Sequence, residues 1–96
     1  MVKVRQFEGR NGPVRNQFII EEDTERGVVI SFQSYDTIIA QKGPHESGVG
    51  RQITLDENSW DYSMTTGRYR NLFLGENKAE TERKIKAGVY KLANLN

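Results

Sequence analysis

Aromatic, hydroxyl and guanidinium groups are concentrated in one stretch of the sequence, residues 60–75. This stretch contains the only Trp, two of the four Tyr, a Thr-Thr pair and two Arg. Arginine beside hydroxyl and amide groups suits phosphate oxygens or the carboxylates of a protein partner, because a guanidinium donates paired hydrogen bonds to either. The candidate binding residues here are Thr66, Arg68, Arg70 and Asn71. A solvated helix face with capping threonines is an equally open interpretation of the same residues.

Charged residues are unevenly distributed, although the net charge of the 96-residue chain is only +1. Four carboxylates form an acidic cluster, made up of Glu21, Glu22, Asp23 and Glu25. The C-terminal part of the chain is basic, and four of its cations extend the candidate surface: Lys78, Arg83, Lys84 and Lys86. A solvated surface of mixed charge is the commoner meaning of such runs. Segregated charge also favours electrostatic steering toward an oppositely charged partner.

The sequence offers little for catalysis or metal binding. It has no cysteine, which excludes disulfides, thiolate metal sites and a cysteine nucleophile. A structural zinc needs four Cys or His ligands, and the single histidine, His45, lies in a segment rich in Gly. Asp56, Glu57 and Asp61 could gather as carboxylates, but turn formation and helix capping suit them better. No base, nucleophile and orienting group occur at a recognisable spacing. We therefore predict a protein that is not an enzyme and that uses no cofactor or metal.

The elements that position these residues can be predicted from hydrophobic periodicity and turn residues. The length is that of one domain, residues 1–96. Alternating or β-branched segments predict strands at residues 2–7, 17–21, 28–33, 37–40 and 51–55. Short turns between them predict an antiparallel meander. Loops are predicted at residues 8–13, 22–27 and 41–50. We expect Arg10, Arg15 and the loop Gln41–Gly50 to be mobile and dispensable for folding.

Two helices and a short strand are predicted after the meander. A polar N-cap, for which Asp61, Ser63 and Thr65 are each plausible, and an apolar period of 3.6 residues predict a helix from about Ser63 to Leu74, ended by Gly75. We expect its inner face to be Tyr69, Leu72 and Phe73, and we expect these polar residues to lie outside that face: Thr66, Arg68 and Arg70.

A second helix is predicted from the capping arrangement of Asn77 with Glu80 to a stop at Gly88. A short last strand follows at residues 89–92. The predicted fold class is therefore α+β, with a small antiparallel sheet packed against two C-terminal helices.

The sequence shows no membrane span and no signal peptide. Its apolar runs are too short to cross a bilayer. Residues 1–5 include basic side chains, but no apolar stretch follows them as it would in a signal peptide. The expected compartment is the cytoplasm.

Several segments carry a pattern that resembles a known group of proteins. These segments are Gln33–Ala40, Ile53–Leu55, Trp60–Ser63 and Arg70–Gly75, together with Thr65 and Thr66. They are similar to small phage- and plasmid-encoded proteins of an uncharacterised family with the pattern S-Y-x-T-x-I-A followed by W-D-Y-S-x-T-T. The resemblance brings no known active site. It implies an origin in a mobile genetic element, from which small non-catalytic proteins commonly bind a host machine or nucleic acid, anti-CRISPR proteins among them.

Two functional hypotheses follow. The first is a protein-binding inhibitor of anti-CRISPR type, which acts on a host Cas nuclease or its nucleoprotein complex. Its acidic cluster would occlude a basic nucleic-acid channel, or it would block a domain movement. The second is a small nucleic-acid-binding accessory protein that uses the cations of the helical side. The acidic cluster favours the first hypothesis, and the basic C-terminal part favours the second.

Overall fold

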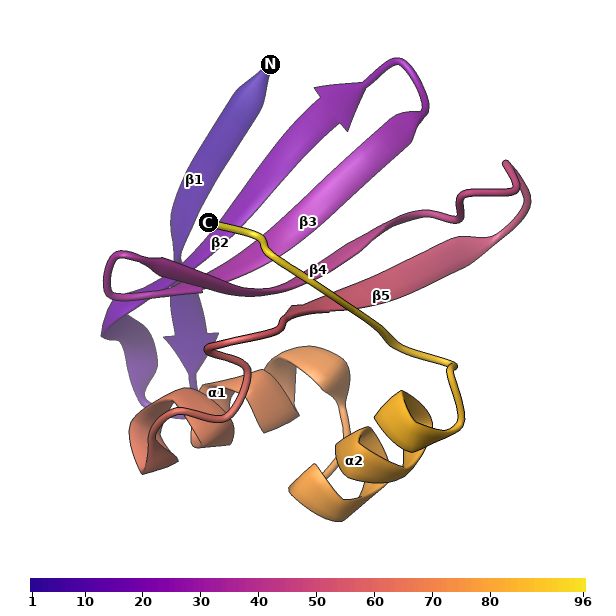
Figure 1. The fold of residues 1–96 in the computed structure, drawn as a ribbon. Coiled ribbons are helices and arrows are strands. Elements are labelled where there is room, and N and C mark those ends of the chain that lie inside the picture. The colour runs from indigo at the N-terminus through magenta and orange to yellow at the C-terminus, as the bar shows by residue number, and fades with distance from the viewer.

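A six-stranded sheet and two helices make up the structure, a computed structural model that describes residues 1–96 (Figure 1). The sheet has the order β1-β2-β3-β4-β5-β6, with antiparallel pairing up to β5 and parallel pairing between β5 and β6. The predicted α+β class is confirmed. The elements are β1 (Val2–Gly9), β2 (Gly12–Thr24), β3 (Gly27–Ser34), β4 (Thr37–Pro44), β5 (Arg51–Asp56), α1 (Met64–Leu74), α2 (Lys78–Lys86) and β6 (Lys91–Ala93).

The first hairpins are longer than the sequence pattern predicts. β1 and β2 pair to the very end of their hairpin, where Gly9 faces Gly12 across a two-residue turn. β2 and β3 do the same at Thr24 and Gly27, and Gly27 has a φ of 131° that favours glycine. In both turns the two turn residues have negative φ, and the glycine that follows them takes the positive φ, 112° at Gly12 and 131° at Gly27. A turn closed by such a glycine is a common hairpin connection, so pairing continues into segments that look polar in the sequence.

Three predicted loops are therefore partly wrong. Arg15 lies within β2, and only Arg10 and its neighbour Asn11 form the first turn. Residues 22–24 belong to β2, and residues 41–44 belong to β4. Hydrogen bonding along the ladder outweighs the low strand propensity of these polar residues, because pairing satisfies backbone groups whatever the side chain.

The hydrophobic core lies between the sheet and α1. Phe32 is fully buried, and its ring centroid lies 5.7 Å from that of Phe7 and 5.8 Å from that of Phe73. Phe7 also contacts the half-buried ring of Tyr69 edge-on at 5.6 Å. The predicted packing of Phe73 and Tyr69 against the sheet is thus confirmed. Leu72 is 59% exposed, so its predicted place in the core is wrong.

The inner face of α1 explains the error at Leu72. The residues of α1 that are buried at helical spacing are Thr66, Arg70 and Phe73, at positions i, i+4 and i+7. Leu72 precedes Phe73 by one residue and is therefore turned by about 100° away from the sheet. Polar residues occupy most of the inner face, so the apolar pattern alone indicates the wrong rotation of the helix.

The C-terminal residues 94–96 complete the edge of β4. Lys91–Ala93 pair in parallel with β5, close to the predicted last strand. Asn96 then accepts a hydrogen bond from the Ile38 amide at 2.8 Å and donates one to the Ile38 carbonyl at 3.0 Å. The Leu95 amide donates to Asp56 Oδ1 at 2.9 Å. The Asn96 side chain thereby satisfies both backbone hydrogen-bonding groups of Ile38, which lies past the end of the β4–β5 pairing.

No helix of the protein is long and apolar enough to span a membrane.

Candidate binding surface

The helix α1 begins and ends where its caps predict. Ser63 has an extended backbone, and its Oγ accepts a hydrogen bond from the Thr66 amide at 3.1 Å. Gly75 ends the helix with a φ of 72°, and its amide donates to the Asn71 carbonyl at 2.8 Å. These two caps fix the length of the helix that carries the candidate residues.

Arg70 is buried, and its predicted exposure is wrong. Only 1% of it is exposed. Its guanidinium donates to the Trp60 carbonyl at 2.9 Å, to Asp61 Oδ1 at 3.0 Å and to Asn71 Oδ1 at 2.8 Å. The same group lies 5.3 Å from the Trp60 ring centroid. Its Nε has no hydrogen-bond partner. Arg70 therefore anchors the segment before α1 to the helix, and it is not free to bind a partner.

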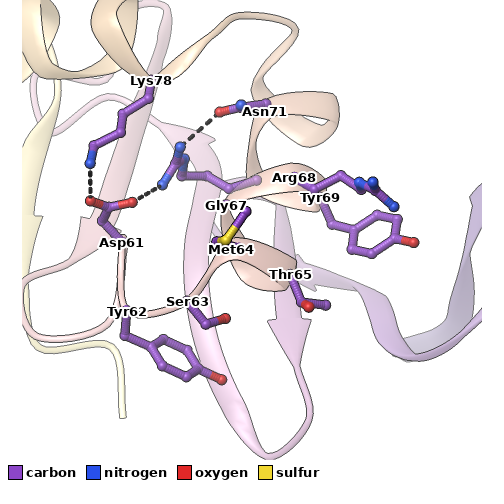
Figure 2. A pocket seen from close by; sticks show the side chains of 11 residues that line it. Asp61, Tyr62, Ser63, Met64, Thr65, Gly67, Arg68, Tyr69, Asn71 and Lys78 are labelled. Atoms are coloured by element: carbon purple, nitrogen blue, oxygen red, sulfur yellow. Dashed lines mark hydrogen bonds and ion pairs between the residues drawn. The ribbon is translucent and has the colours of Figure 1, made fainter.

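Asp61 joins α1 to α2. Figure 2 shows its carboxylate between two cations, with dashed lines to the buried guanidinium and to Lys78. Lys78 Nζ lies 2.7 Å from Asp61 Oδ2. Partial burial alone would raise the pKa of Asp61, but the hydrogen bonds from Lys78 and Arg70 hold it below the usual value. Asp61 lines a shallow pocket of about 810 Å³. A carboxylate held ionised between two cations is a poor general base, so Asp61 acts here as a structural link rather than as a proton acceptor.

Thr66 is also buried, contrary to its predicted exposure. It is fully inaccessible, and its Oγ1 lies 3.0 Å from Ser34 Oγ on β3. A polar contact thus lies under the first turn of α1, where an apolar contact would be usual. Gln17 of β2 is 1% exposed, and its Oε1 has no partner. Thr65 is exposed whereas Thr66 is buried, so the two threonines of the Thr-Thr pair lie on different sides of α1.

Arg68 is the candidate arginine that faces solvent. Figure 2 shows Arg68 and Tyr69 on the side of α1 away from Asp61 and Lys78. Arg68 lines a groove between α1 and the β1–β2 hairpin, and two residues that the sequence predicted only to be mobile, Arg10 and Arg15, line it as well. No periodicity links residues 10 and 15 to residue 68, so sequence reasoning missed this grouping. Asn71 is half-buried and is engaged by Arg70.

Most of the predicted cations of α2 are paired within the domain. Lys78 binds Asp61, Arg83 contacts Glu80 at 2.8 Å, and Lys84 contacts Glu76 at 2.7 Å. Lys86 is exposed and makes no ion pair. The predicted basic helical face is therefore largely neutralised by neighbouring carboxylates, which lowers its attraction for phosphate.

Glu76 is the centre of a buried polar cluster that the sequence did not predict. Its carboxylate, 7% exposed, accepts hydrogen bonds from Lys84 Nζ at 2.7 Å, Tyr90 Oη at 2.6 Å and Thr81 Oγ1 at 2.7 Å. Burial opposes ionisation, but these donors hold the pKa of Glu76 below its usual value. Burial and the bond to Glu76 raise the pKa of Tyr90. The cluster joins the two ends of α2 to the chain that enters β6.

The predicted acidic cluster is spread over the end of the β2–β3 hairpin. Glu21, Glu22 and Asp23 lie in β2, so their side chains alternate between the two sheet faces, and only Glu25 lies in the turn. Glu21 pairs with Arg5 at 3.3 Å. The other three are exposed and make no ion pair within the domain. We call Glu22, Asp23 and Glu25 the acidic end.

His45 forms part of a local turn. Its Nδ1 lies 2.9 Å from Ser47 Oγ and accepts a hydrogen bond from the Ser47 amide at 3.1 Å. The Ser47 hydroxyl in turn accepts from the Val49 amide. These short-range contacts shape the loop between β4 and β5. No three His, Asp or Glu side chains of the protein are grouped as metal ligands would be.

Comparison with known proteins shows the family of this chain. A model of the DUF8033 family, which is described as a family of unknown function, matches residues 2–88, and the chain therefore belongs to that family. The match covers all of the sheet up to β5 and both helices. No curated protein matches the sequence. No solved structure matches the fold.

Proposed function

We propose that this protein is a non-catalytic binding protein whose acidic end docks on a basic surface of a protein partner. The observation that carries the proposal is that Glu22, Asp23 and Glu25 are exposed and make no ion pair within the domain. In Figure 1 the β2–β3 turn lies at the end of the sheet far from α1 and α2. The three carboxylates are therefore accessible at this end, as an intermolecular contact requires.

Free carboxylates at a projecting end favour a basic partner for a kinetic reason. Charge complementarity raises the rate of encounter and makes that rate sensitive to salt. The proposed partner class is accordingly a host nuclease or its nucleoprotein complex, such as a Cas nuclease in the host cytoplasm. The resemblance of residues 33–40 and 60–66 to phage- and plasmid-encoded proteins supports this counter-defence, anti-CRISPR-type role.

The basic C-terminal helices provide weaker support for the alternative, nucleic-acid binding by that face. Lys78, Arg83 and Lys84 each have a carboxylate within 2.8 Å, and Arg70 is buried. A phosphate would have to compete with carboxylates that are already in place. The acidic end has no comparable internal competitor, so we favour a protein partner for it.

Charge reversal tests the proposal. In the variant Glu22→Lys/Asp23→Lys/Glu25→Lys, association with an immobilised Cas nuclease should slow by at least about tenfold at low salt, since steering by opposite charge becomes repulsion. The matched control is Asp36→Lys/Glu57→Lys/Glu82→Lys, which changes the net charge equally but away from the acidic end. Circular dichroism of each variant checks folding.

The control and the parent should bind alike, and binding of the parent should weaken as salt rises. Equal binding by the acidic-end variant and the parent, with both folded, would contradict the proposal. So would loss of binding in the control alone, because that result would place the contact elsewhere on the surface.

A further inference from the structure

Three arginines without any partner converge on one groove. The chain has eight arginines, and five of them use their guanidinium in a hydrogen bond or ion pair: Arg5, Arg26, Arg51, Arg70 and Arg83. The other three, Arg10, Arg15 and Arg68, make no such contact, and all three line the groove between the β1–β2 hairpin and α1. We call this the arginine groove.

Two distant parts of the sequence build the arginine groove. The β1–β2 hairpin places Arg10, in its turn, and Arg15, in β2, on one side, and the outer face of α1 places Arg68 on the other. The apolar part of the wall comes from Phe7, Val14, Tyr69 and Leu72, and Leu72 is 59% exposed. Its only carboxylate is Glu8, which makes no ion pair with the arginines.

The size and chemistry of the groove point to an extended anion. Its volume of about 1210 Å³ exceeds what a single phosphate or carboxylate would fill. Unpaired guanidinium groups bind phosphate oxygens through paired, directional hydrogen bonds. We propose that the arginine groove binds the sugar–phosphate backbone of a single-stranded nucleic acid.

A single strand suits the groove better than an acidic protein segment or a duplex. Phosphates recur at every nucleotide, so one strand can supply an anion to each of the three arginines along its path. Half-buried Tyr69 and exposed Leu72 offer an aromatic ring and an apolar surface beside the arginines. Unpaired bases can use such surfaces by stacking, whereas the bases of a duplex are already stacked on each other.

This site is separate from the acidic end and does not rest on the proposed function. The pairing of Gly9 with Gly12 and of Thr24 with Gly27 places the two hairpin turns at opposite ends of β2 (Figure 1). A protein with an acidic end and an arginine groove so placed can contact the protein part and the nucleic-acid part of one complex at once.

The test uses the purified protein and no other protein. Fluorescence anisotropy would follow binding of a labelled 12-nucleotide oligothymidylate between about 50 and 200 mM salt. Three contacted phosphates on a single strand give a slope of log K against log salt of roughly −2, from about −0.7 per phosphate. The variant Arg10→Gln/Arg15→Gln/Arg68→Gln should lose at least tenfold in affinity at 50 mM salt, and its slope should approach zero.

A matched control has the same net charge as the groove variant. It is Arg26→Gln/Arg83→Gln/Lys86→Gln, which removes three exposed cations outside the groove and should keep the affinity within about twofold. The single variant Arg68→Gln, checked by circular dichroism, should make the slope less negative by about 0.7, and it stands in for the triple variant if that fails to fold.

Several results would overturn the proposal. They are the absence of oligonucleotide binding at 50 mM salt, equal binding by parent and groove variant, and equal losses in the groove variant and the control. Another is oligonucleotide binding that falls as the protein concentration rises and that the Glu22→Lys/Asp23→Lys/Glu25→Lys variant restores. That result would show that the groove binds the acidic end of a second copy. Failure of the Cas-nuclease experiment leaves this test unaffected, so the two proposals fail independently.

Discussion

The buried guanidinium of Arg70 lies 3.0 Å from Asp61 Oδ1, and the other oxygen of the same carboxylate holds Lys78 at 2.7 Å. One carboxylate therefore links the segment before α1, the helix α1 and the start of α2. This link needs Arg70, which the sequence predicted to be exposed for binding a partner. The residue types of a binding site therefore form a structural connection here.

Removing the buried member of this connection should destabilise the protein. Arg70→Ala leaves the Trp60 carbonyl and one side of Asp61 without a donor. We expect a loss near the lower end of the ~3–5 kcal/mol that follows when a buried ion pair is broken, because Asp61 is 30% exposed and keeps Lys78. Urea unfolding followed by circular dichroism measures the loss. Arg68→Ala, on the solvent side of the same helix, should stay within about 0.5 kcal/mol of the parent. Equal effects of the two substitutions would show that Arg70 is not a structural anchor.

Replacing Gly67, within α1, and Gly75, at its C-terminal cap, by alanine should change the stability of the protein in opposite directions. A Cβ at Gly67 would meet the Arg70 guanidinium at 3.7 Å, an ordinary contact, so Gly67→Ala should stabilise the protein by about 0.5–1 kcal/mol. Gly75 has a φ of 72°, and Gly75→Ala should cost about 1–2 kcal/mol despite open space around it. Thermal melts of both variants check these signs. A destabilising Gly67→Ala would mean that the packing of Arg70 against the helix is tighter than this structure has it.

Neighbouring apolar residues of α1 should differ sharply in their contribution to stability. Phe73 is 8% exposed and packs on Phe32, whereas Leu72 is 59% exposed. Phe73→Ala should therefore cost about 3–5 kcal/mol. Leu72→Ala should change the free energy of unfolding by no more than about 0.5 kcal/mol. Denaturant titrations of the two variants distinguish this rotation of α1 from one that buries Leu72. In that other rotation the difference between the two losses of stability would shrink or change sign.

The Glu76 cluster should give the protein a measurable acid sensitivity. The pKa of Glu76 is lower in the folded protein than its usual value of 4.5, so the unfolded chain binds the proton first as pH falls. The advantage of the parent over Glu76→Gln should be fully present above about pH 4.5, on the order of 2 kcal/mol, and should shrink as pH falls further through the folded pKa. Unfolding titrations between about pH 7 and pH 3 measure the difference. Glu82→Gln, whose carboxylate lies 3.9 Å from Lys78 on the surface, is the control and should show little change. A difference that stays constant over the whole range would contradict the role of the charge.

Periodicity and caps predicted much of the fold, because they depend on neighbours along the chain. The strands, the α1 caps at Ser63 and Gly75, and the Asn77 cap, which accepts from the Glu80 amide, all follow from local residue types. The length of β2 did not follow, because it depends on hydrogen bonds to β1 and β3. The rotation of α1 did not follow either. Its inner face carries Thr66 and Arg70, whose partners on other elements make their burial tolerable.

The candidate site was predicted less well than the fold. Of the candidate residues on α1, Arg68 alone is an exposed cation, and its groove partners come from a hairpin more than 50 positions earlier in the chain. A single sequence contains no signal for such proximity, since neither spacing nor periodicity relates the two segments. Charge was located correctly along the chain, but whether a charge is free depends on the carboxylate or cation that the fold places beside it.

The parallel pairing of β5 with β6 has a consequence for the order in which the chain acquires its structure. The hairpins that join β1 to β4 have two-residue turns and can close as soon as their residues leave the ribosome. β6 must wait for residues 57–90, because both helices lie between it and its neighbour. Until then β5 is an open sheet edge able to pair with another chain, and Phe7 and Phe32 also lack their cover until α1, which precedes β6, has been made. The nascent domain is therefore most prone to aggregate between the synthesis of its fifth strand and that of its last residues.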